Sequence, residues 1–487
     1  MSSLFPALTP TAGGPDHGDR VALRFGDRSL TYGQLAGAAG ALAARIGPAA
    51  EGGRVALWAT PSLETAVGTV AALVAGVPVV PLNPRTGERE LAHILSDSAP
   101  SLLLAAPDDE LPAGVGSLER VDVPVTGEGR VPAGEPGPGA PAFVVYTSGT
   151  TGPPKGAVLP RRAVATTLDA LQDAWQWSAD DVLVHALPLF HVHGLILGIV
   201  GPLRRGGEVR HLGRFTPEGV ARELRRGGTM LFGVPTMYHR LAEALDDDAE
   251  LAKALTGARL LVSGSAALPL PDHERIAAAT GRRVIERYGM TETLMNTSVR
   301  VDGRARPGTV GVPLRGVSLR LVDEDGTQIT AWDGETIGEI QVRGDHLFTG
   351  YLNRPDATAA AFDGDWFRTG DMAVRDADGY VRIVGRKATD LIKSGGYKIG
   401  AGEIENVLLD HPAVREAAVT GAPDADLGER IVAWIVAADP QAPPSAEEVT
   451  AHVAAQLAPH KRPREVRFLD VLPRNDMGKI MKRALHG

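Results

Sequence analysis

Short apolar runs alternate with longer stretches rich in alanine and leucine along most of the chain. The runs at residues 54–58 and 77–80 have the length of buried strands, and helical patterns lie between such runs. An uncharged stretch at residues 66–82 contains Gly76 and two prolines and is short for a membrane span, so it predicts a helix that turns into a strand. The alternation predicts an α/β protein with largely parallel sheets.

The C-terminal part of the chain shows a different order of elements. A helix is predicted from about Gly402, followed by strands near residues 416–420 and 430–437. Ser445 and Glu448 then have the spacing of a capping box, which marks the start of a further helix. This order of elements predicts a small α+β domain.

A polar stretch at residues 385–390 separates the two patterns and is the predicted domain boundary. We expect a large N-terminal domain at residues 1–386, made of mixed, mostly parallel sheets flanked by helices. Residues 387–487 are expected to form the small α+β domain.

Composition and charge exclude several classes of function. The chain has 487 residues with 50 Lys+Arg and 59 Asp+Glu, a net charge of −9 with neutral histidines, which argues against nucleic acid as the main partner. It contains no cysteine, so disulfides, thiolate zinc sites, iron–sulfur clusters and a cysteine nucleophile are excluded. The N-terminus has no basic region followed by an apolar one, so we expect a cytoplasmic protein without a membrane partner. Oligomeric state is left open.

Residues 143–156 carry the first chemical signal, an apolar strand that runs into a loop rich in hydroxyls and glycines. Hydroxyls, close-approach glycines and one lysine are what a loop needs to surround a polyphosphate. It is not a Walker A loop, because two prolines precede the lysine and a glycine follows it. An ordinary Ser/Thr/Gly turn is the alternative. The candidate phosphate contacts are Thr147, Ser148, Gly149, Thr150, Thr151, Gly152 and Lys155.

The string at residues 146–156 resembles the phosphate loop of the adenylate-forming superfamily, which comprises acyl-CoA synthetases, adenylation domains of peptide synthetases, and luciferases. Further motifs resemble those of this superfamily in the right order, and together they span most of the chain. They lie at residues 187–194, 287–293, 366–371, 385–405 and 475–480.

The resemblance implies two half-reactions and a mobile C-terminal domain. A carboxylate attacks the α-phosphate of ATP, giving an acyl-adenylate and pyrophosphate, and a thiol, usually coenzyme A, then displaces AMP. The small domain is expected to rotate between the two steps. Its hinge is left open among Ala388, Thr389 and Asp390, because this sequence departs from the family there.

The same resemblance assigns residues to ATP and Mg²⁺. Glu292 is the candidate Mg²⁺ ligand, with Thr151 as a second, and Thr291 resembles the contact to the α-phosphate. Lys479 resembles the lysine that bridges the substrate carboxylate and the α-phosphate. An exposed structural glutamate and a solvated lysine in a basic tail are the respective alternatives. The remaining nucleotide-binding candidates are Tyr288, which offers a face to adenine, Asp371 for the ribose hydroxyls, Arg386 for ribose or phosphate, and Gly264, Ser265, Ala266, Gly289 and Met290.

Two histidines and a glycine pair are assigned to the acyl and thiol channels. His191 and His193 have the spacing of two strand-side zinc ligands, but the resemblance makes His191 a gate between the channels and places His193 on the acyl-pocket wall. A buried, hydrogen-bonded histidine without function is the alternative. The loop expected to face the thiol channel comprises Ser394, Gly395, Gly396 and Tyr397.

Arg287 points to the class of acid. It directly precedes Tyr288, where the geometry of the family directs it toward the acyl site, with His193 and Ser263 nearby. An arginine fork with a hydroxyl and an imidazole would bind a second carboxylate and reject a plain fatty acid. A structural ion pair is the alternative role for Arg287. Met237 and Arg240 are the further acyl-site candidates, Arg240 being the weaker alternative cation.

Residues 287–298 and 472–479 resemble malonyl-CoA synthetases most closely. We therefore expect a ligase that joins a small dicarboxylate, malonate or a 2-substituted malonate such as methylmalonate, to coenzyme A. The alternatives are a short- or medium-chain monocarboxylate–CoA ligase, a standalone enzyme that loads a carrier protein, a light-emitting mono-oxygenase, and a nucleotide-binding protein without activity.

Overall fold

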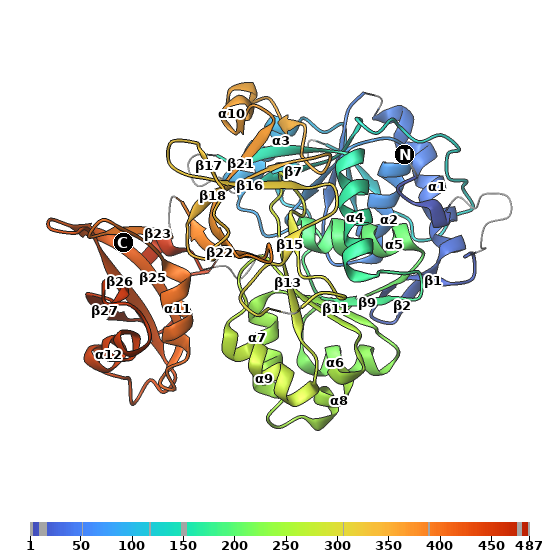
Figure 1. Cartoon of the computed structure of the whole chain (residues 1–487). Coiled ribbons are helices and arrows are strands. Elements are labelled where there is room, and N and C mark those ends of the chain that lie inside the picture. The colour runs from blue at the N-terminus through green and yellow to red at the C-terminus, as the bar shows by residue number, and fades with distance from the viewer. Residues whose placement is uncertain are drawn as a thin grey trace.

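The structure is a computed structural model that describes residues 3–8, 17–50, 52–115, 118–147, 153–304, 306–387, 390–474 and 480–485. Three sheets form the larger part of the molecule, and a fourth forms the C-terminal part, which lies to one side in Figure 1. This arrangement confirms the predicted α/β class with a small C-terminal α+β domain. Among the described helices, none combines the length and the apolar character needed to cross a bilayer.

The first two sheets are mostly parallel. The seven-stranded sheet has the order β19 (Gly350–Tyr351), β8 (Lys155–Pro160), β7 (Pro141–Thr147), β4 (Val79–Leu82), β3 (Val55–Trp58), β5 (Leu102–Ala105) and β6 (Glu119–Asp122). The nine-stranded sheet has the order β15 (Val312–Pro313), β14 (Thr297–Ser298), β13 (Val284–Tyr288), β12 (Leu260–Ser263), β11 (Met230–Gly233), β9 (Val182–His185), β10 (Glu208–His211), β1 (Val21–Phe25) and β2 (Arg28–Thr31).

Helices cover both sheets, and one of them is buried between the two. All residues of α2 (Leu63–Val74) are buried, because the helix contacts β3 and β5 of one sheet and β1 of the other. The predicted passage from helix to strand at residues 66–82 is the step from α2 to β4. The other helices here are α1 (Tyr32–Ala49), α3 (Glu88–Ser98), α4 (Arg161–Trp175), α5 (Gly201–Arg205), α6 (Pro217–Arg225), α7 (Pro235–Ala244), α8 (Ala249–Gly257), α9 (Leu270–Thr280), α10 (Pro355–Ala360) and the π-helix η3 (His193–Val200).

A third, antiparallel sheet connects these layers to the C-terminal part. Its strands are β17 (Gln328–Ile329), β16 (Ser318–Val322), β18 (Gly338–Arg343), β21 (Trp366–Arg375) and β20 (Phe362–Asp363), with β22 (Val381–Arg386) paired to β21. The chain leaves the sheet at the end of β22 and enters the C-terminal part.

The C-terminal part has an apolar core of its own, made of residues between Ile392 and Val466. The predicted capping box is present, since Ser445 and Glu448 each accept from the other's backbone N–H. The exact boundary at residues 386 and 387 stays a prediction. The elements are β23 (Leu391–Ser394), β24 (Tyr397–Gly400), α11 (Ala401–Leu409), β25 (Val414–Asp424), β26 (Gly428–Ala437), α12 (Ala446–Gln456) and β27 (Glu465–Phe468).

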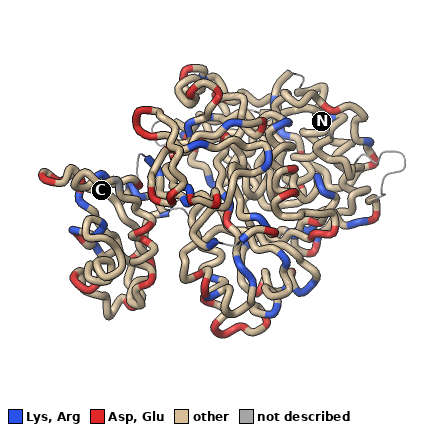
Figure 2. Tube along the Cα trace, viewed as in Figure 1, with Lys and Arg blue, Asp and Glu red and all other residues tan. Residues whose placement is uncertain are grey.

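Charged residues of both signs are interspersed over the two parts of the molecule (Figure 2). Two ion pairs join lysines that follow β22 to glutamates of the third sheet and of one of its turns. Lys387 Nζ lies 2.8 Å from Glu339 of β18, and Lys393 Nζ of β23 lies 2.9 Å from Glu324, in the turn between β16 and β17.

Two buried histidines at the ends of neighbouring strands are held in the neutral form. His185 of β9 and His211 of β10 pack with ring centroids 4.7 Å apart. The Nδ1 of His185 accepts from the Leu187 N–H, and the Nδ1 of His211 accepts from the Gly213 N–H, which requires an unprotonated nitrogen. Burial accordingly lowers the pKa of His211 to about 4 and the pKa of His185 well below its usual value.

We expect the free energy of unfolding to fall as the pH is lowered from about 7 to about 5. In this range His185 and His211 bind protons in the unfolded chain but stay neutral in the folded protein. Each such histidine contributes a slope of up to about 1.4 kcal/mol per pH unit between its folded and unfolded pKa values. Urea denaturation at several pH values measures this slope. His211→Asn keeps an acceptor near the Gly213 N–H and removes the titration, so its slope should be smaller; an unchanged slope would contradict the assignment.

Candidate functional site

The predicted site residues gather at the carboxyl ends of the parallel strands of the nine-stranded sheet, the edge at which open α/β sheets bind ligands. Ser263 ends β12, and Arg287 and Tyr288 end β13. His193 begins η3, two strands away along the same edge, where its ring lies 5.9 Å from the ring of Phe232 at the end of β11. Strand order therefore brings together residues that are far apart in the sequence.

Arg287 is a buried cation for which the described residues provide no partner. Its Nε and Nη2 have no hydrogen-bond partner among the residues the structure describes, and no ion pair to it occurs there, so the alternative of a structural ion pair is not observed. Burial lowers the pKa of Arg287 only to about 10, so the guanidinium keeps its charge at neutral pH. Such a charge is expensive in the interior unless an anion accompanies it.

The strand alternation explains why the neighbouring carboxylate does not pair with Arg287. Successive side chains of a strand point to opposite faces. Glu286 lies on the other face of β13, where it accepts from the Leu268 N–H at 2.9 Å and from His273 Nε2 at 3.0 Å.

Gly264 leaves the space that the Arg287 guanidinium occupies. A Cβ at Gly264 would lie 2.3 Å from Arg287 Cζ, so only glycine leaves room for the arginine to lie against the backbone that follows β12. The Ser263 hydroxyl beside it is buried and unpartnered among the described residues.

The two candidate histidines are neutral. Burial and the charge of Arg287 lower the pKa of His191 to about 4 and that of His193 well below its usual value. Both ring nitrogens of His193 lack a partner within the described part of the chain, so the hydrogen bonds expected for a structural histidine are not observed there. No group of three or more His, Asp or Glu side chains in the described ranges could hold a metal ion, so the zinc alternative finds no support there.

A second group of residues lies where the phosphate loop begins and ends. Thr147 and Lys155 face each other as the last and first residues of β7 and β8. Glu292 is buried and accepts a 2.7 Å hydrogen bond from the Tyr351 hydroxyl, and Lys155 Nζ lies 4.3 Å from the centre of the Tyr351 ring. Tyr351 thus joins the loop lysine to the candidate metal ligand, a role that no local sequence signal indicated.

Asp371, Arg386 and Tyr288 form a third group. Asp371 Oδ1 lies 2.8 Å from Arg386 Nε, and its Oδ2 accepts a 2.6 Å hydrogen bond from the Tyr288 hydroxyl. The carboxylate expected to receive the ribose hydroxyls is therefore held by the two other residues assigned to the nucleotide. A carboxylate oxygen can accept more than one hydrogen bond, so these contacts leave capacity for ribose.

The turns around these groups are tightly packed. A Cβ at Gly289 would lie 1.8 Å from the Leu294 carbonyl oxygen, so this position in the motif at residues 287–293 requires glycine. The next residues, Met290 and Thr291, are half-buried and buried. Ser265 has φ +75°, and Ser265 and Ala266 lie exposed after Gly264.

The two further acyl candidates on α7 lie differently. Met237 is half-buried and packs beside Gly233 at the end of β11. Arg240 is exposed, with its guanidinium 5.1 Å from the centre of the Phe215 ring, and no interaction of the described residues joins it to Arg287. The structure therefore does not bring Arg240 into the buried group.

The candidate thiol-channel residues form the turn between β23 and β24. Gly395 and Gly396 have φ of +58° and +82°, and the exposed Tyr397 ring stacks on His460 at 4.1 Å. No hydrogen bond, ion pair or ring contact in the described ranges joins this turn or the buried Ser394 to His191 or Arg287.

Several expected site residues lie outside the described residues. They are Ser148, Gly149, Thr150, Thr151, Gly152, Lys479 and the hinge candidates Ala388 and Thr389. Their assigned roles stay predictions.

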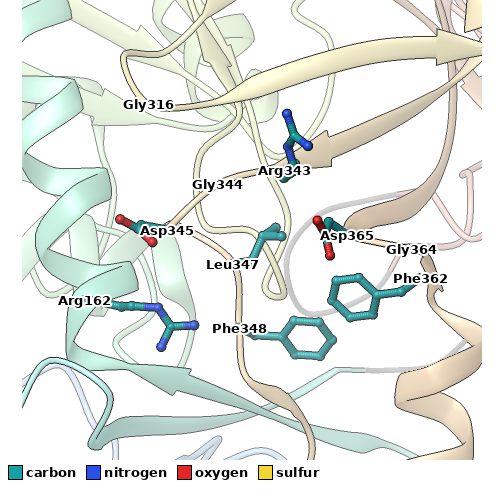
Figure 3. A pocket seen from close by; sticks show the side chains of 10 residues that line it. All are labelled: Arg162, Gly316, Arg343, Gly344, Asp345, Leu347, Phe348, Phe362, Gly364 and Asp365. Atoms are coloured by element: carbon teal, nitrogen blue, oxygen red, sulfur yellow. The ribbon is translucent and has the colours of Figure 1, made fainter.

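A cavity of about 590 Å³ lies next to these groups but is not the candidate site. Figure 3 shows Arg162 and Asp345 on one side of it, Phe362 and Asp365 on the other, and Leu347 between them. None of the expected site residues lines it.

Comparison with known proteins identifies the family. The model of the AMP-binding enzyme family matches residues 13–352, and the model of the AMP-binding enzyme C-terminal domain matches residues 403–479. The malonate–CoA ligase of Arabidopsis thaliana is 34% identical, over 96% of this chain and 86% of its own length.

Two solved structures are similar in fold to this protein over nearly its whole length. A malonyl-CoA ligase in a ternary product complex with methylmalonyl-CoA and AMP is 74% identical, with a TM-score of 0.76 over 96% of this chain and 100% of that one. ATP-bound MatB from Rhodopseudomonas palustris is 34% identical, with a TM-score of 0.90 over 99% and 97%. These matches confirm the resemblance found in the sequence motifs, and the chain belongs to the AMP-binding enzyme family.

Proposed function

We propose that this protein is an AMP-forming ligase that joins malonate to coenzyme A at the expense of ATP. Its similarity to the malonate–CoA ligase and the malonyl-CoA ligase supports this substrate. The observation that carries the proposal is the buried guanidinium of Arg287, which keeps its charge and has N–H groups without protein partners in the described part of the chain.

Arg287 would bind the carboxylate of malonate that does not react. An anion there compensates the buried charge, and the nearby neutral imidazole of His193 and the free hydroxyl of Ser263 add uncharged partners. A monocarboxylate such as butyrate would leave the guanidinium buried and unpaired, which disfavours its binding. Substituted malonates such as methylmalonate keep both carboxylates and remain candidate substrates.

The first half-reaction would use the groups around Glu292 and Asp371. The second carboxylate of malonate attacks the α-phosphorus, a carboxylate oxygen–phosphorus bond forms, and the bond to pyrophosphate breaks. Lys155 and Lys479 would place positive charge on the reacting anions, and Thr291 would contact the α-phosphate. Asp371 would receive the ribose hydroxyls while Arg386 and Tyr288 fix its orientation.

Glu292 suits a Mg²⁺ ion, which proteins bind through one or two carboxylates while substrate phosphates fill further positions. The carboxylate is buried next to the phosphate loop and is oriented by Tyr351, and Thr151 would be the second protein ligand. The ion would supply positive charge to the polyphosphate.

In the second half-reaction the thiol of coenzyme A would attack the carbonyl carbon of malonyl-adenylate, and AMP would leave. We propose that residues 387–487 rotate so that the turn with Gly395 and Gly396 faces the thiol channel at His191. The higher TM-score to the ATP-bound structure, despite its lower identity, supports an arrangement nearer to adenylation. A carrier protein is the alternative acceptor, and the cytoplasm is the proposed location.

Arg287→Ala is expected to lower kcat/KM for malonate by about 100-fold or more, which corresponds to the roughly 3 kcal/mol that a buried, paired charge contributes. The KM for ATP should stay unchanged. AMP formation with malonate, methylmalonate, acetate and butyrate measures the effect. Because Arg287 has no protein partner to lose among the described residues, the ligand-free variant should not be less stable than the wild type. Undiminished selectivity for malonate over butyrate would refute the proposed clamp.

Gly264→Ala tests the same clamp without removing the arginine. Its Cβ would displace the guanidinium, so malonate turnover should fall while the KM for ATP changes less. Gly257→Ala, at the end of α8, is the matched control, since its Cβ would meet nothing within 4 Å. Equal loss of malonate and butyrate turnover in Gly264→Ala would point to a general packing defect instead.

A further inference from the structure

A half-buried lysine lies three residues after Lys479. Lys482 is the first residue of η5 (Lys482–Leu485), and its side chain is 15% exposed. Its Nζ lies 2.9 Å from Asp390 Oδ1 and 2.7 Å from Glu405 Oε1 of α11. Burial lowers the pKa of Lys482, but the two carboxylates outweigh this effect and raise it, so the lysine is charged. The two carboxylates therefore hold Lys482 in place, and it is not a solvated lysine of a basic tail.

Asp390 continues the contact toward the nucleotide site. Its Oδ2 accepts from the backbone N–H of Arg386 at 3.0 Å, in a turn so tight that a Cβ at Gly385, which has φ +147°, would lie 2.4 Å from Asp390 Cβ. Arg386 in turn pairs with Asp371, which accepts from Tyr288. An unbroken series of polar contacts thus runs from Lys482 to the residues assigned to adenine and ribose.

The C-terminal segment around Lys482 is held from its other side as well. Arg474 and Ile480 form an antiparallel bridge, and the Met481 N–H donates to the Pro473 carbonyl at 2.8 Å. Leu485 is buried in an apolar cluster with Trp434. Arg474 and Ile480 are therefore paired, and Lys482 lies on the same short segment as Ile480, three residues after Lys479 in the sequence.

We propose that Lys482 is a positioning residue for adenylation, which ties the segment bearing Lys479 to Asp390 and Glu405 and so sets that segment against the Arg386–Asp371 pair. This inference rests on the proposed function, because it concerns the step that Lys479 serves. Lys482 itself touches neither substrate nor reacting atoms.

The test separates the two half-reactions. Malonate-dependent exchange of pyrophosphate into ATP measures adenylation, and release of AMP from supplied malonyl-adenylate by coenzyme A measures thioester formation. Lys482→Met is expected to slow exchange by about 100-fold, the loss that a displacement of about 1 Å causes at a catalytic group. Thioester formation from supplied adenylate should be unchanged, and Lys482→Arg should restore most of the exchange. Lys253→Met, at an exposed lysine of α8, is the matched control.

A double-mutant cycle tests the contact itself. If Lys482 acts through Asp390, then Lys482→Met combined with Asp390→Asn should slow exchange less than the product of the two single effects. Equal loss in both half-reactions, normal exchange in Lys482→Met, or independent effects in the cycle would each overturn the inference. Lys479→Ala distinguishes the levels: if it keeps normal exchange, the proposed role of Lys479 fails, whereas a loss there with normal exchange in Lys482→Met defeats only the inference.

Discussion

The burial of one positive charge, to which the described residues offer no counter-charge, constrains the proposed acyl site of this protein. Transfer of a charged group from water into the interior costs several kcal/mol even after relaxation, and a protein normally offsets this cost with a counter-charge of its own. At Arg287 the nearest carboxylate in the sequence, Glu286, is turned to the opposite face of β13 and bound to His273. The neighbouring His191 and His193 are neutral and supply no charge. The described residues offer no carboxylate to this charge, so we propose that the ligand supplies the negative charge and that the site is thereby selective for a second carboxylate.

At the proposed nucleotide site, by contrast, the charged groups already have protein partners. Asp371 is already engaged by Arg386 and Tyr288, and Glu292 by Tyr351, before any ligand is considered. These partners orient each carboxylate, so in the proposed function ATP meets groups that are fixed in advance and need little reorganisation. In the proposed function the acid is selected by a cation that the described residues leave unpaired, whereas ATP is received by carboxylates that already have protein partners. The two halves of the site thus divide specificity from positioning.

Short-range patterns in the sequence predicted several of the elements, whereas the roles they assign to site residues stay predictions. The capping box of Ser445 and Glu448 spans three residues, and its hydrogen bonds form as the spacing requires. The alternation of strand side chains also contains the reason that Glu286 cannot pair with Arg287. Contacts such as Tyr351 to Glu292 or Lys482 to Asp390 join residues far apart in the chain, and no local pattern encodes which distant residue will arrive. The π-helix at His193 likewise carried no signal, because its apolar residues fit a buried helix of any pitch.

The C-terminal part has an apolar core of its own, and exposed ion pairs are among its contacts with the third sheet. Its own apolar core and the half-buried Lys482 with its two carboxylates hold the segments around Asp390, Glu405 and η5 together as a unit. The ion pairs that face the third sheet are of a different kind: Lys393 and Glu324 are 63% and 48% exposed, and exposed pairs contribute only about 0–1 kcal/mol. Lys387 with Glu339 is half-exposed on the lysine side. Leu391 also packs against Met372, Val374 and Val384 of the third sheet, so ion pairs are not the whole of this contact. The apolar core would let the C-terminal part keep its internal geometry during the rotation that we propose between the two half-reactions.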